Sequence, residues 1–431
     1  MPASRPPSAR DSEREQQNPF PRFIDTDDAG RELFRIEDRR EQVYSQDVQR
    51  YEVIILGGGM VAGYAAKEAI EGGLKPGQLA IVSADDALPY ERPPLSKSFL
   101  AGKDNERSVL VSDENFYRGH GIDVYLKLQV QSIDLAGKRL LAKSGEEFGF
   151  DKLILATGSR VRRLDVPGAD RGNVLYLRSL SDAARLRDAL KSAKKVAVVG
   201  ASFIGMEVAS QSAQQGRETS MFFPQDRVWK SFFTLEMSRF FEKYYQDRGV
   251  RLVPGAQVAA IGDGFVSLSN GAKFDADLVV AGVGVTPVTD IAEAAGLRVE
   301  NGILVNEFLE TSAADVYAAG DVVQYQDVLT GKRRRLEHWD NAVKQGQYLA
   351  RRLRGETEPF RNIPYFFSDV FDLSYEFWGN AEGAERTEYR GDVNSSSFSA
   401  WWFKGDRVVA AFVMNRPDAE REAASQLLPV D

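Results

Sequence analysis

The chain has 431 residues, enough for two or three domains with a sizeable core. Its net charge of −8 argues against a nucleic-acid partner. No apolar run approaches the roughly 18 residues that a membrane span needs. Cysteine is absent and only two histidines occur, which excludes disulfides, a redox-active dithiol and a Cys/His metal site. Any redox chemistry must therefore rest on an organic cofactor.

Residues 1–48 are rich in Pro, Ser and charged residues of both signs, and they show no apolar targeting segment. We expect a disordered N-terminal extension. A docking role, with a short polar helix over residues 32–42, is the alternative. The absence of a targeting pattern predicts a cytoplasmic location.

A dinucleotide-binding pattern stands near the start of the remaining chain. The apolar run Val53 to Leu56 leads directly into three glycines and then into an Ala-rich helical pattern. Strand, tight turn and helix in this order are typical of the first unit of a dinucleotide-binding fold. Gly57 permits the turn, Gly59 lets a pyrophosphate approach the backbone, and Ala62 lets the helix pack closely on the strand.

The same pattern recurs at residues 195–209, where an apolar strand is followed by Gly200, Ser202 and Gly205. Ser202 stands where the middle glycine would be, and it is still small. Two such units in one chain predict two dinucleotides and electron transfer between two cofactors. A degenerate second copy beside one dinucleotide domain is the alternative.

Two segments after the first unit carry further candidates. Residues 79–83 are predicted to form the second strand, and an acid near the end of that strand usually binds the adenosine ribose. Asp85 is the candidate for this role. Arg92 is planar and always charged, which suits a phosphate or an adenine face, and Lys97 follows a rigid Pro-Pro. Surface solvation is the alternative for both cations.

Four segments together resemble the flavoprotein family that binds two dinucleotides, which includes ferredoxin reductases, apoptosis-inducing factor and monodehydroascorbate reductase. They are residues 89–97 (PYERPPLSK), 153–158 (LILATG), 200–207 (GASFIGME) and 316–321 (VYAAGD). The resemblance runs from about residue 50 to 415 and is strongest to plant-type monodehydroascorbate reductase. It implies an α/β fold with two Rossmann-like dinucleotide-binding domains, for FAD and for NAD(P), and a C-terminal α+β domain.

The domain boundaries follow from the same resemblance. The predicted parts are the extension (1–48), an FAD-binding domain in two pieces (49–165 and 287–352), an NAD(P)-binding domain (166–286) and a C-terminal domain (353–431). Strands at residues 397–403 and 407–413 make the last domain antiparallel, and a charged helix over 416–428 follows them.

The resemblance also implies which residues hold the two cofactors. For FAD they are Gly57, Gly59, Met60, Val61, Ala62, Asp85, Arg92, Lys97, Val130, Ala156, Thr157, Gly158, Arg178, Gly320, Asp321, Glu337 and His338. For NAD(P)H they are Gly200, Ser202, Phe203, Ile204, Gly205, Glu207, Gln225, Arg227, Gly282 and Gly284. Asp321 matches the acid that accepts from the ribityl hydroxyl of the flavin. Trp339 and Phe367 are expected to border the flavin.

Hydride transfer requires the nicotinamide C4 to stack within about 3.5 Å of the flavin N5. In the related ferredoxin reductases, the lysine of PPLSK pairs with the glutamate that follows the second glycine turn, close to N5. The resemblance maps this pair onto Lys97 and Glu207, which with His338 are the predicted catalytic residues. A buried cation there would favour the anionic reduced flavin. An ion pair that merely joins two domains is the alternative.

The nucleotide specificity departs from the plant pattern. Gln225 stands where monodehydroascorbate reductase has a ribose-binding Glu. A missing acid removes repulsion for a 2′-phosphate, and Arg227 or Lys230 could attract one. NADPH, or use of both nucleotides, is therefore slightly favoured.

The acceptor site departs from it as well. The arginine assigned to ascorbyl binding falls at Val343, and a Tyr and an Arg of the plant pattern are replaced by Phe367 and Asp369. A small anionic acceptor binds poorly without a paired donor. The resemblance therefore supports the cofactor sites more strongly than reduction of an ascorbyl radical.

The leading prediction is an FAD-dependent NAD(P)H oxidoreductase without a redox-active disulfide. It would pass electrons to a ferredoxin-like protein, a quinone or another small acceptor, as a monomer or a homodimer. The alternatives are a monodehydroascorbate reductase with a rebuilt pocket, a slow redox-sensing module like apoptosis-inducing factor, and a structural protein that stores FAD. Lys97 and Glu207 favour catalysis.

Overall fold

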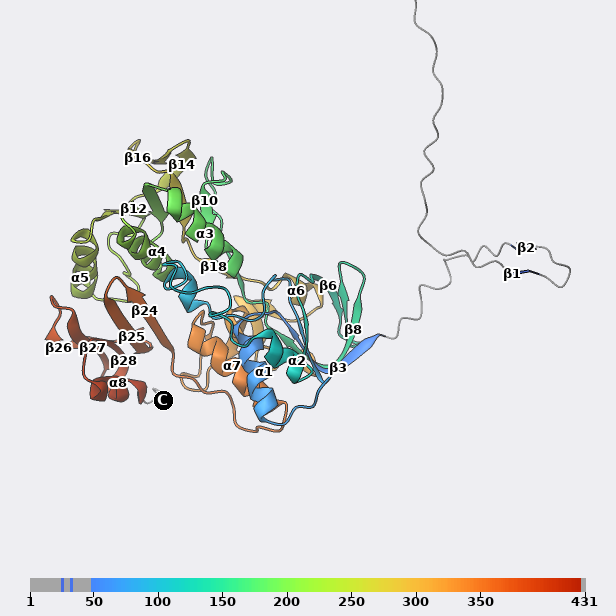
Figure 1. Ribbon diagram of the computed structural model, residues 1–431. Coiled ribbons are helices and arrows are strands. Elements are labelled where there is room, and N and C mark those ends of the chain that lie inside the picture. The colour runs from blue at the N-terminus through green and yellow to red at the C-terminus, as the bar shows by residue number, and fades with distance from the viewer. Residues whose placement is uncertain (1–24, 27–31, 34–47, 428–431) are drawn as a thin grey trace, which may run out of the picture. The chain divides into compact units, whose positions relative to one another are not determined.

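The computed structural model describes residues 25–26, 32–33 and 48–427 (Figure 1). The chain divides into two units, Met1–Asp47 and Val48–Asp431. In the first unit, β1 (Asp25–Thr26) pairs antiparallel with β2 (Glu32–Leu33). The polar helix predicted from residue 32 is therefore wrong at its first two residues. The rest of the predicted extension lies outside the described residues.

A seven-stranded sheet carries the first glycine turn. Its order is β5 (Asp123–Tyr125), β4 (Leu79–Val82), β3 (Gln49–Leu56), β8 (Glu147–Leu155), β7 (Arg139–Ala142) and β6 (Val130–Asp134), and β21 (Val316–Ala318) also pairs with β8. The pairs from β5 to β8, and β21 with β8, are parallel. Residues 53–56 of β3 are buried because helices cover both faces of a parallel sheet.

The helices α1 (Met60–Glu71) and α7 (Trp339–Arg352) lie side by side in this part of the molecule (Figure 1). Gly346 permits the close contact, because a Cβ there would lie 2.6 Å from the Val61 carbonyl oxygen. The helix α2 (Glu114–Gly119) belongs to the same region.

The chain leaves this sheet and later returns to it. β21 pairs with β8, although the second nucleotide unit separates the two strands in the sequence. A smaller sheet accompanies the return, in the order β19 (Val299–Glu300), β20 (Gly302–Val305), β22 (Val323–Gln326) and β23 (Arg333–Arg334), with the helices α6 (Asp290–Ala294) and η2 (Gly320–Val322). This topology is what a discontinuous FAD domain requires, while the exact domain boundaries stay a prediction.

A second, fully parallel sheet carries the second glycine turn. Its order is β10 (Val174–Tyr176), β17 (Leu278–Ala281), β11 (Lys195–Val199), β12 (Glu218–Phe223) and β13 (Val250–Pro254), with the helices α3 (Leu180–Ser192), α4 (Phe203–Gln214) and α5 (Leu235–Gln246). A three-stranded antiparallel sheet adjoins it, made of β14 (Val258–Gly262), β15 (Phe265–Leu268) and β16 (Lys273–Asp275). β9 (Ser159–Val161) and β18 (Val285–Pro287) pair where the chain passes between the two nucleotide units.

The C-terminal part is a five-stranded antiparallel sheet. Its order is β24 (Tyr365–Val370), β25 (Leu373–Gly379), β28 (Arg407–Met414), β27 (Ser397–Lys404) and β26 (Arg386–Asp392), followed by α8 (Asp418–Ser425). The two predicted strands are confirmed, and the predicted helix is shorter than expected. Phe412 of the sheet and Phe241 of α5 share one apolar core. The α/β class with two Rossmann-like units and a C-terminal α+β domain is confirmed.

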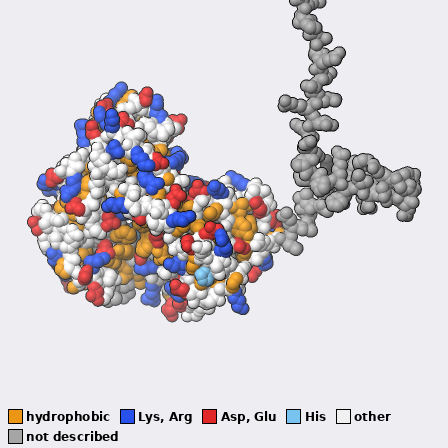
Figure 2. Space-filling view, in the orientation of Figure 1, with side chains coloured by type: hydrophobic (Ala, Val, Ile, Leu, Met, Phe, Trp, Pro, Cys, Tyr) orange, Lys and Arg blue, Asp and Glu red, His pale blue; other side chains and the backbone are white. Residues whose placement is uncertain are grey.

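Three further features of the described residues are the surface charge, the lengths of the helices and the placement of possible metal ligands. Charged side chains of both signs are interspersed on the face seen in Figure 2. Within the described residues, no helix is both long and apolar enough to cross a bilayer. The same residues contain no group of three or more side chains suited to hold a metal ion.

Candidate functional site

A large cavity of about 1180 Å³ lies along the first glycine turn and reaches α4 and β24. Its volume exceeds the roughly 300–1,000 Å³ of a pocket for a drug-sized ligand, as a dinucleotide requires. The predicted residues that line it are Gly57, Gly59, Met60, Val61, Asp85, Arg92, Lys97, Val130, Ala156, Thr157, Gly158, Arg178, Phe203, Ile204, Glu207, Gly320, Asp321, Glu337, His338, Trp339 and Phe367. Ala62 is fully buried behind the cavity, where it packs in the core.

The first glycine turn is shaped by close backbone contacts. Gly57 has a φ of +127°, and a Cβ there would lie 2.1 Å from the Ala156 carbonyl oxygen. A Cβ on Gly58 would collide with the Ser83 hydroxyl, whereas a Cβ on Gly59 would meet only Arg92, at 3.9 Å. Gly59 precedes α1, and no side chain caps the helix there. Free N–H groups at a helix start, facing a cavity, form a site for a phosphate.

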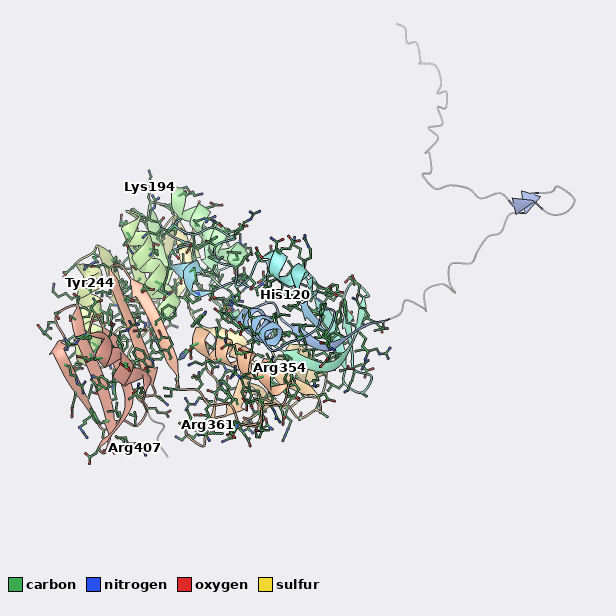
Figure 3. All side chains as sticks on the ribbon, turned by 60° about the horizontal axis from the view of Figure 1, so that its bottom comes forward. His120, Lys194, Tyr244, Arg354, Arg361 and Arg407 are labelled. Atoms are coloured by element: carbon green, nitrogen blue, oxygen red, sulfur yellow. The ribbon has the colours of Figure 1, made fainter. Side chains whose placement is uncertain are left out.

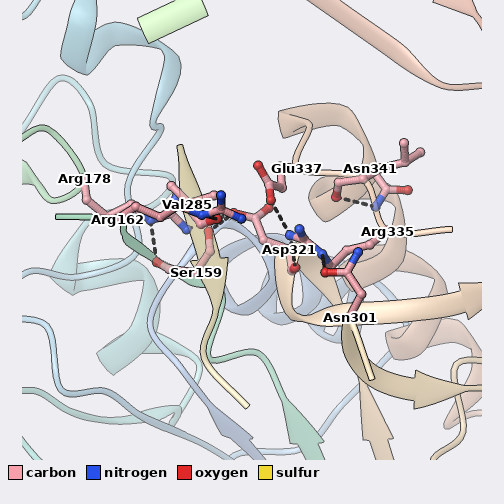
Figure 4. Close-up of polar contacts among 10 residues, drawn as sticks. Ser159, Arg162, Arg178, Val285, Asn301, Asp321, Arg335, Glu337 and Asn341 are labelled. Atoms are coloured by element: carbon pink, nitrogen blue, oxygen red, sulfur yellow. Dashed lines mark hydrogen bonds and ion pairs between the residues drawn. The ribbon is translucent and has the colours of Figure 1, made fainter. Parts of the chain in front are cut away.

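Two arginines, Arg92 and Arg178, add positive charge beside this turn. The Arg178 guanidinium donates to the Ser159 carbonyl oxygen at 2.8 Å and to the Asp321 carboxylate at 2.9 Å (Figure 4). Arg92 donates to the Arg178 carbonyl oxygen. Of the two guanidinium groups, only that of Arg178 forms an ion pair with Asp321, and Arg92 lines the same cavity beside Gly59. This arrangement fits the pyrophosphate of FAD.

Asp321 is held as an anion. Burial alone would raise the pKa of its carboxyl, but the charges of Arg178 and Arg92 and the hydrogen bonds from Ser159 and Arg178 hold that pKa below its usual value. The Ser159 hydroxyl donates to the carboxylate at 2.9 Å. An ionised acceptor with a free oxygen at the cavity wall suits a ribityl hydroxyl, as the resemblance implies.

Asp85 lines the cavity where the chain leaves β4. The Tyr90 hydroxyl donates to the Asp85 carboxylate at 2.9 Å, and Asp85 donates its own N–H to the Ser83 hydroxyl. Asp85 therefore follows β4 in a fixed position, as a ribose-binding acid must. The predicted role in adenosine binding stays a prediction.

The predicted pair of Lys97 and Glu207 is present inside the cavity. The Lys97 ammonium lies 2.8 Å from the Glu207 carboxylate, and the two side chains are 13% and 3% exposed. Lys97 ends the 3₁₀ turn η1 (Pro93–Ser96) and Glu207 lies on α4, so the pair joins the two nucleotide units. A buried pair of this kind is stable only when its remaining lone pairs are satisfied.

Two serines that the sequence analysis missed provide those partners. The Ser368 hydroxyl, on β24, donates to one oxygen of Glu207 at 2.5 Å, and the Ser96 hydroxyl donates to the other oxygen. Ser96 and Ser368 are both buried. Three parts of the chain therefore hold one carboxylate, and the carboxylate holds the ammonium of Lys97 in place.

His338 and Trp339 form a further wall of the cavity, at the start of α7. Burial lowers the pKa of His338 to about 4, against an opposing effect from Asp321. The ring is therefore neutral at pH 7 and brings no charge to the site. The Trp339 indole N–H donates to Glu91, which also accepts from the Tyr64 hydroxyl at 2.7 Å. Glu337 is exposed and pairs with Arg335 (Figure 4).

The second glycine turn is assembled as predicted but lies outside the large cavity. A Cβ on Gly200 would lie 2.4 Å from the Gly282 carbonyl oxygen, and one on Gly205 would lie 2.2 Å from the Gly200 carbonyl oxygen. The Ser202 hydroxyl caps α4 by accepting from the Gly205 N–H at 3.1 Å. Phe203 and Ile204, at the first turn of α4, connect this site to the large cavity.

The other residues predicted for NAD(P)H lie around this turn. Gln225 is exposed and Arg227 is half-buried, both just after β12. Lys230 pairs with Asp226 at 3.0 Å, which leaves Arg227 as the better candidate for a 2′-phosphate. The Gly284 carbonyl oxygen accepts from the Arg162 N–H, which fixes the strand edge before β18.

The position at which the plant pattern has its ascorbyl-binding arginine is buried in this chain. Val343 is 7% exposed and packs in the core of the first nucleotide unit. Val343 lies outside the set of residues that lines the cavity. An arginine there would bury an unpaired charge, so replacing Val343 would damage the fold before it changed the acceptor.

Comparison with known proteins agrees with this geometry. Residues 51–346 match the family model described as pyridine nucleotide-disulphide oxidoreductase, and residues 365–428 match the reductase C-terminal model. Monodehydroascorbate reductase of Solanum lycopersicum is 33% identical, covering 88% of this chain and 94% of the relative. The Pisum sativum enzyme is 34% identical with the same coverage.

Solved structures are similar across both nucleotide units and the C-terminal sheet. A ferredoxin reductase from Rhodopseudomonas palustris superposes with a TM-score of 0.83 at 34% identity, covering 87% of this chain and 93% of that chain. The reductase in a covalent putidaredoxin reductase–putidaredoxin complex gives 0.84 at 30% identity, with 89% and 94% covered. The chain therefore belongs to the pyridine nucleotide-disulphide oxidoreductase family, as an FAD-dependent NAD(P)H oxidoreductase whose sequence contains no cysteine.

Proposed function

We propose that this oxidoreductase passes electrons from NAD(P)H to a ferredoxin-like protein. The observation that supports the redox part most directly is the buried pair of Lys97 and Glu207, with Ser96 and Ser368 on the two carboxylate oxygens. FAD, when bound, supplies a centre that takes a hydride and gives electrons singly. Single-electron release is what an iron–sulfur acceptor needs.

The residues of this chain have separate tasks in that proposal. Arg92 and Arg178 bind the pyrophosphate, and Asp321 orients the ribityl chain. Glu207 holds the Lys97 ammonium in a dry site, where a cation stabilises negative charge more strongly than in water. Phe367, Trp339 and neutral His338 exclude water from the same region.

The choice of a ferredoxin-like acceptor is supported by the similar solved structures and by the absence of an arginine at the ascorbyl-binding position. Of the two similar reductases described above, one is a ferredoxin reductase and the other forms a complex with putidaredoxin. The position expected for an ascorbyl-binding arginine is the buried Val343. Reduction of a small radical, as the names of the plant relatives suggest, is the second candidate, because these relatives are 33–35% identical.

The acceptor is tested on the purified, FAD-loaded protein with NADPH and with NADH. We expect that a panel of [2Fe–2S] ferredoxins will include one that supports cytochrome c reduction, with a kcat/KM above that for enzymatically generated ascorbyl radical. Faster reduction of the ascorbyl radical than of every ferredoxin would contradict the proposal and favour the second candidate. Slow reoxidation by every acceptor would favour a redox sensor.

We also propose that NADPH is used at least as well as NADH. The support is Arg227, a half-buried cation after β12, beside the uncharged Gln225. Arg227→Ala should raise the KM for NADPH about tenfold, since a charge-assisted contact contributes about 1.5 kcal/mol or more, and should leave the KM for NADH nearly unchanged. Equal changes for both nucleotides would show that Arg227 does not contact the 2′-phosphate.

A further inference from the structure

A second cavity, of about 570 Å³, lies beside the first one. Its volume is in the range of roughly 300–1,000 Å³ that small organic ligands occupy. It is lined by Leu329, Asp340, Lys344, Arg361, Asn362, Ile363, Tyr365, Trp378 and Ser425. Asp340 and Tyr365 also line the large cavity, so the two cavities share part of a wall.

The shared wall is aromatic and rigid. The rings of Tyr365 and Trp378 lie 5.2 Å apart between centroids, and those of Tyr365 and Phe367 lie 6.2 Å apart. The Tyr365 hydroxyl donates to Glu376 at 2.8 Å, and Arg421 donates to the same carboxylate at 2.8 Å. A row of three rings therefore leads from Phe367 in the large cavity to Trp378 in the second one.

The charges in the second cavity favour an anion. The Lys344 ammonium lies 2.9 Å from the Asp340 carboxylate and donates to the Asn362 amide oxygen at 3.0 Å, so that pair is neutral as a whole. Arg361 is exposed and has no ion-pair or hydrogen-bond partner among residues 48–427. Figure 3 shows Arg361 at the surface of the molecule, in the connection between α7 and the C-terminal sheet. The Glu376–Arg421 pair behind Tyr365 is also neutral as a whole.

We propose that this second cavity binds a planar aromatic anion, such as a sulfonated or carboxylated quinone, as a small electron acceptor. The ring would lie against Trp378 and Tyr365, and the anionic group would pair with Arg361. The apolar side chains Leu329 and Ile363 complete the contact with the ring. The proposal rests on the proposed function for its source of electrons, the same NAD(P)H oxidation, and goes beyond it in the acceptor.

The overall reaction balances without a further reactant. NAD(P)H and one proton from solvent convert the quinone to the hydroquinone, with NAD(P)⁺ as the other product, so two electrons and two protons are transferred. Because the second cavity does not include the second glycine turn, the acceptor and NAD(P)H bind without competing. The kinetics should therefore show no competition between quinone and NAD(P)H.

Binding is tested on the oxidised, FAD-loaded protein with two naphthoquinones that share one ring system. 1,4-Naphthoquinone-2-sulfonate carries the anion, and menadione, which is 2-methyl-1,4-naphthoquinone, carries none. Arg361→Gln should raise the dissociation constant of the sulfonate about tenfold, measured by equilibrium dialysis, and change that of menadione less than twofold. Arg354→Gln is the matched control, because Arg354 is an arginine two residues after α7 that does not line the cavity (Figure 3).

A second variant reports the position of the ring. Trp378→Phe should remove most of the tryptophan-fluorescence quenching that the sulfonate causes, while dialysis still detects binding. An unchanged dissociation constant in Arg361→Gln, or unchanged quenching in Trp378→Phe, would overturn the proposal. Two further assays use the same samples. They measure anaerobic reduction of the bound FAD by NAD(P)H and ferredoxin-dependent reduction of cytochrome c. Failure of these two assays with intact sulfonate binding would contradict the proposed function and leave the second binding site standing.

Discussion

The two glycine turns differ in whether a side chain accepts a hydrogen bond from the N–H groups at the start of the following helix. At the first turn, Gly59 precedes α1 without a side-chain cap, and Arg92 and Arg178 lie close by. At the second turn, the Ser202 hydroxyl already accepts from the Gly205 N–H. Each helix start leaves N–H groups without a partner inside the helix, so a capped start has less to offer a phosphate.

This difference suits two kinds of ligand, one that stays bound and one that exchanges. The first turn opens into a large cavity, with Arg92 and Arg178 beside the turn, which suits a cofactor that stays bound. The second turn has one donor already satisfied, and the residues after β12 are exposed or half-buried, which suits a nucleotide that binds and leaves. The same strand–turn–helix motif therefore suits a cofactor that stays bound at the first site and a nucleotide that exchanges at the second.

The largest effect is expected at the first turn. Arg178→Ala removes two hydrogen bonds and leaves Asp321 buried without its cation, so the dissociation constant of FAD should rise roughly 100-fold, or about 3 kcal/mol. The measurement is titration of the apoprotein with FAD by flavin fluorescence. Arg139→Ala, which breaks two exposed ion pairs in the sheet that carries the first turn, should leave the affinity unchanged. Equal affinities in both variants would refute the assignment of the first turn.

An intermediate effect is expected where the two nucleotide sites meet. Ser368→Ala removes one hydroxyl from Glu207, so Lys97 is held less firmly, and the rate of FAD reduction by NAD(P)H should fall about tenfold. The reduction potential of the bound FAD should also fall, because a displaced cation stabilises added negative charge less. Stopped-flow absorbance and dye-equilibrated potentiometry measure the two quantities.

Ser399→Ala is the control for that prediction, since Ser399 is a fully buried serine in the same sheet that binds Glu420 instead. It should change stability and leave the potential unchanged. If Ser368→Ala left both the rate of FAD reduction and the FAD reduction potential unchanged, the contact of Ser368 with Glu207 would have only a structural role.

The smallest effect is expected at the second turn. Ser202→Gly removes the cap and frees the Gly205 N–H for a phosphate, at a stability cost of only a few tenths of a kcal/mol. The KM for NAD(P)H should fall about two- to threefold, with little change in kcat. Thr234→Gly, at the capped start of α5, should leave the KM unchanged. A rise in KM for the Ser202 variant would show that its hydroxyl binds the nucleotide instead of weakening the site.

The parts predicted best were those that local sequence determines. The turns at Gly57 and Gly200 could be recognised because an apolar strand, a glycine turn and a small-residue helix follow each other within a few residues. The contact of Lys97 with Glu207 came from a family resemblance, since spacing alone does not predict a contact between distant residues.

The parts that failed depend on tertiary packing. Ser368 is 161 residues from Glu207 in the sequence, and a serine in a strand carries no signal for such a contact. Gln345 was missed in the same way, although its amide oxygen accepts from the Gly320 N–H at 2.7 Å. The burial of Val343 was not predicted either, because it depends on how α7 packs in the core of the first nucleotide unit.

The most direct test of the two-site account is gel filtration in nucleotide-free buffer, followed by anaerobic titration with NADPH or NADH. We predict that FAD stays with the protein while nicotinamide nucleotide is lost, and that one equivalent of added nucleotide then bleaches the visible flavin absorption. A protein that elutes without flavin and does not take it up, or a bound flavin that neither nucleotide bleaches, would contradict the account.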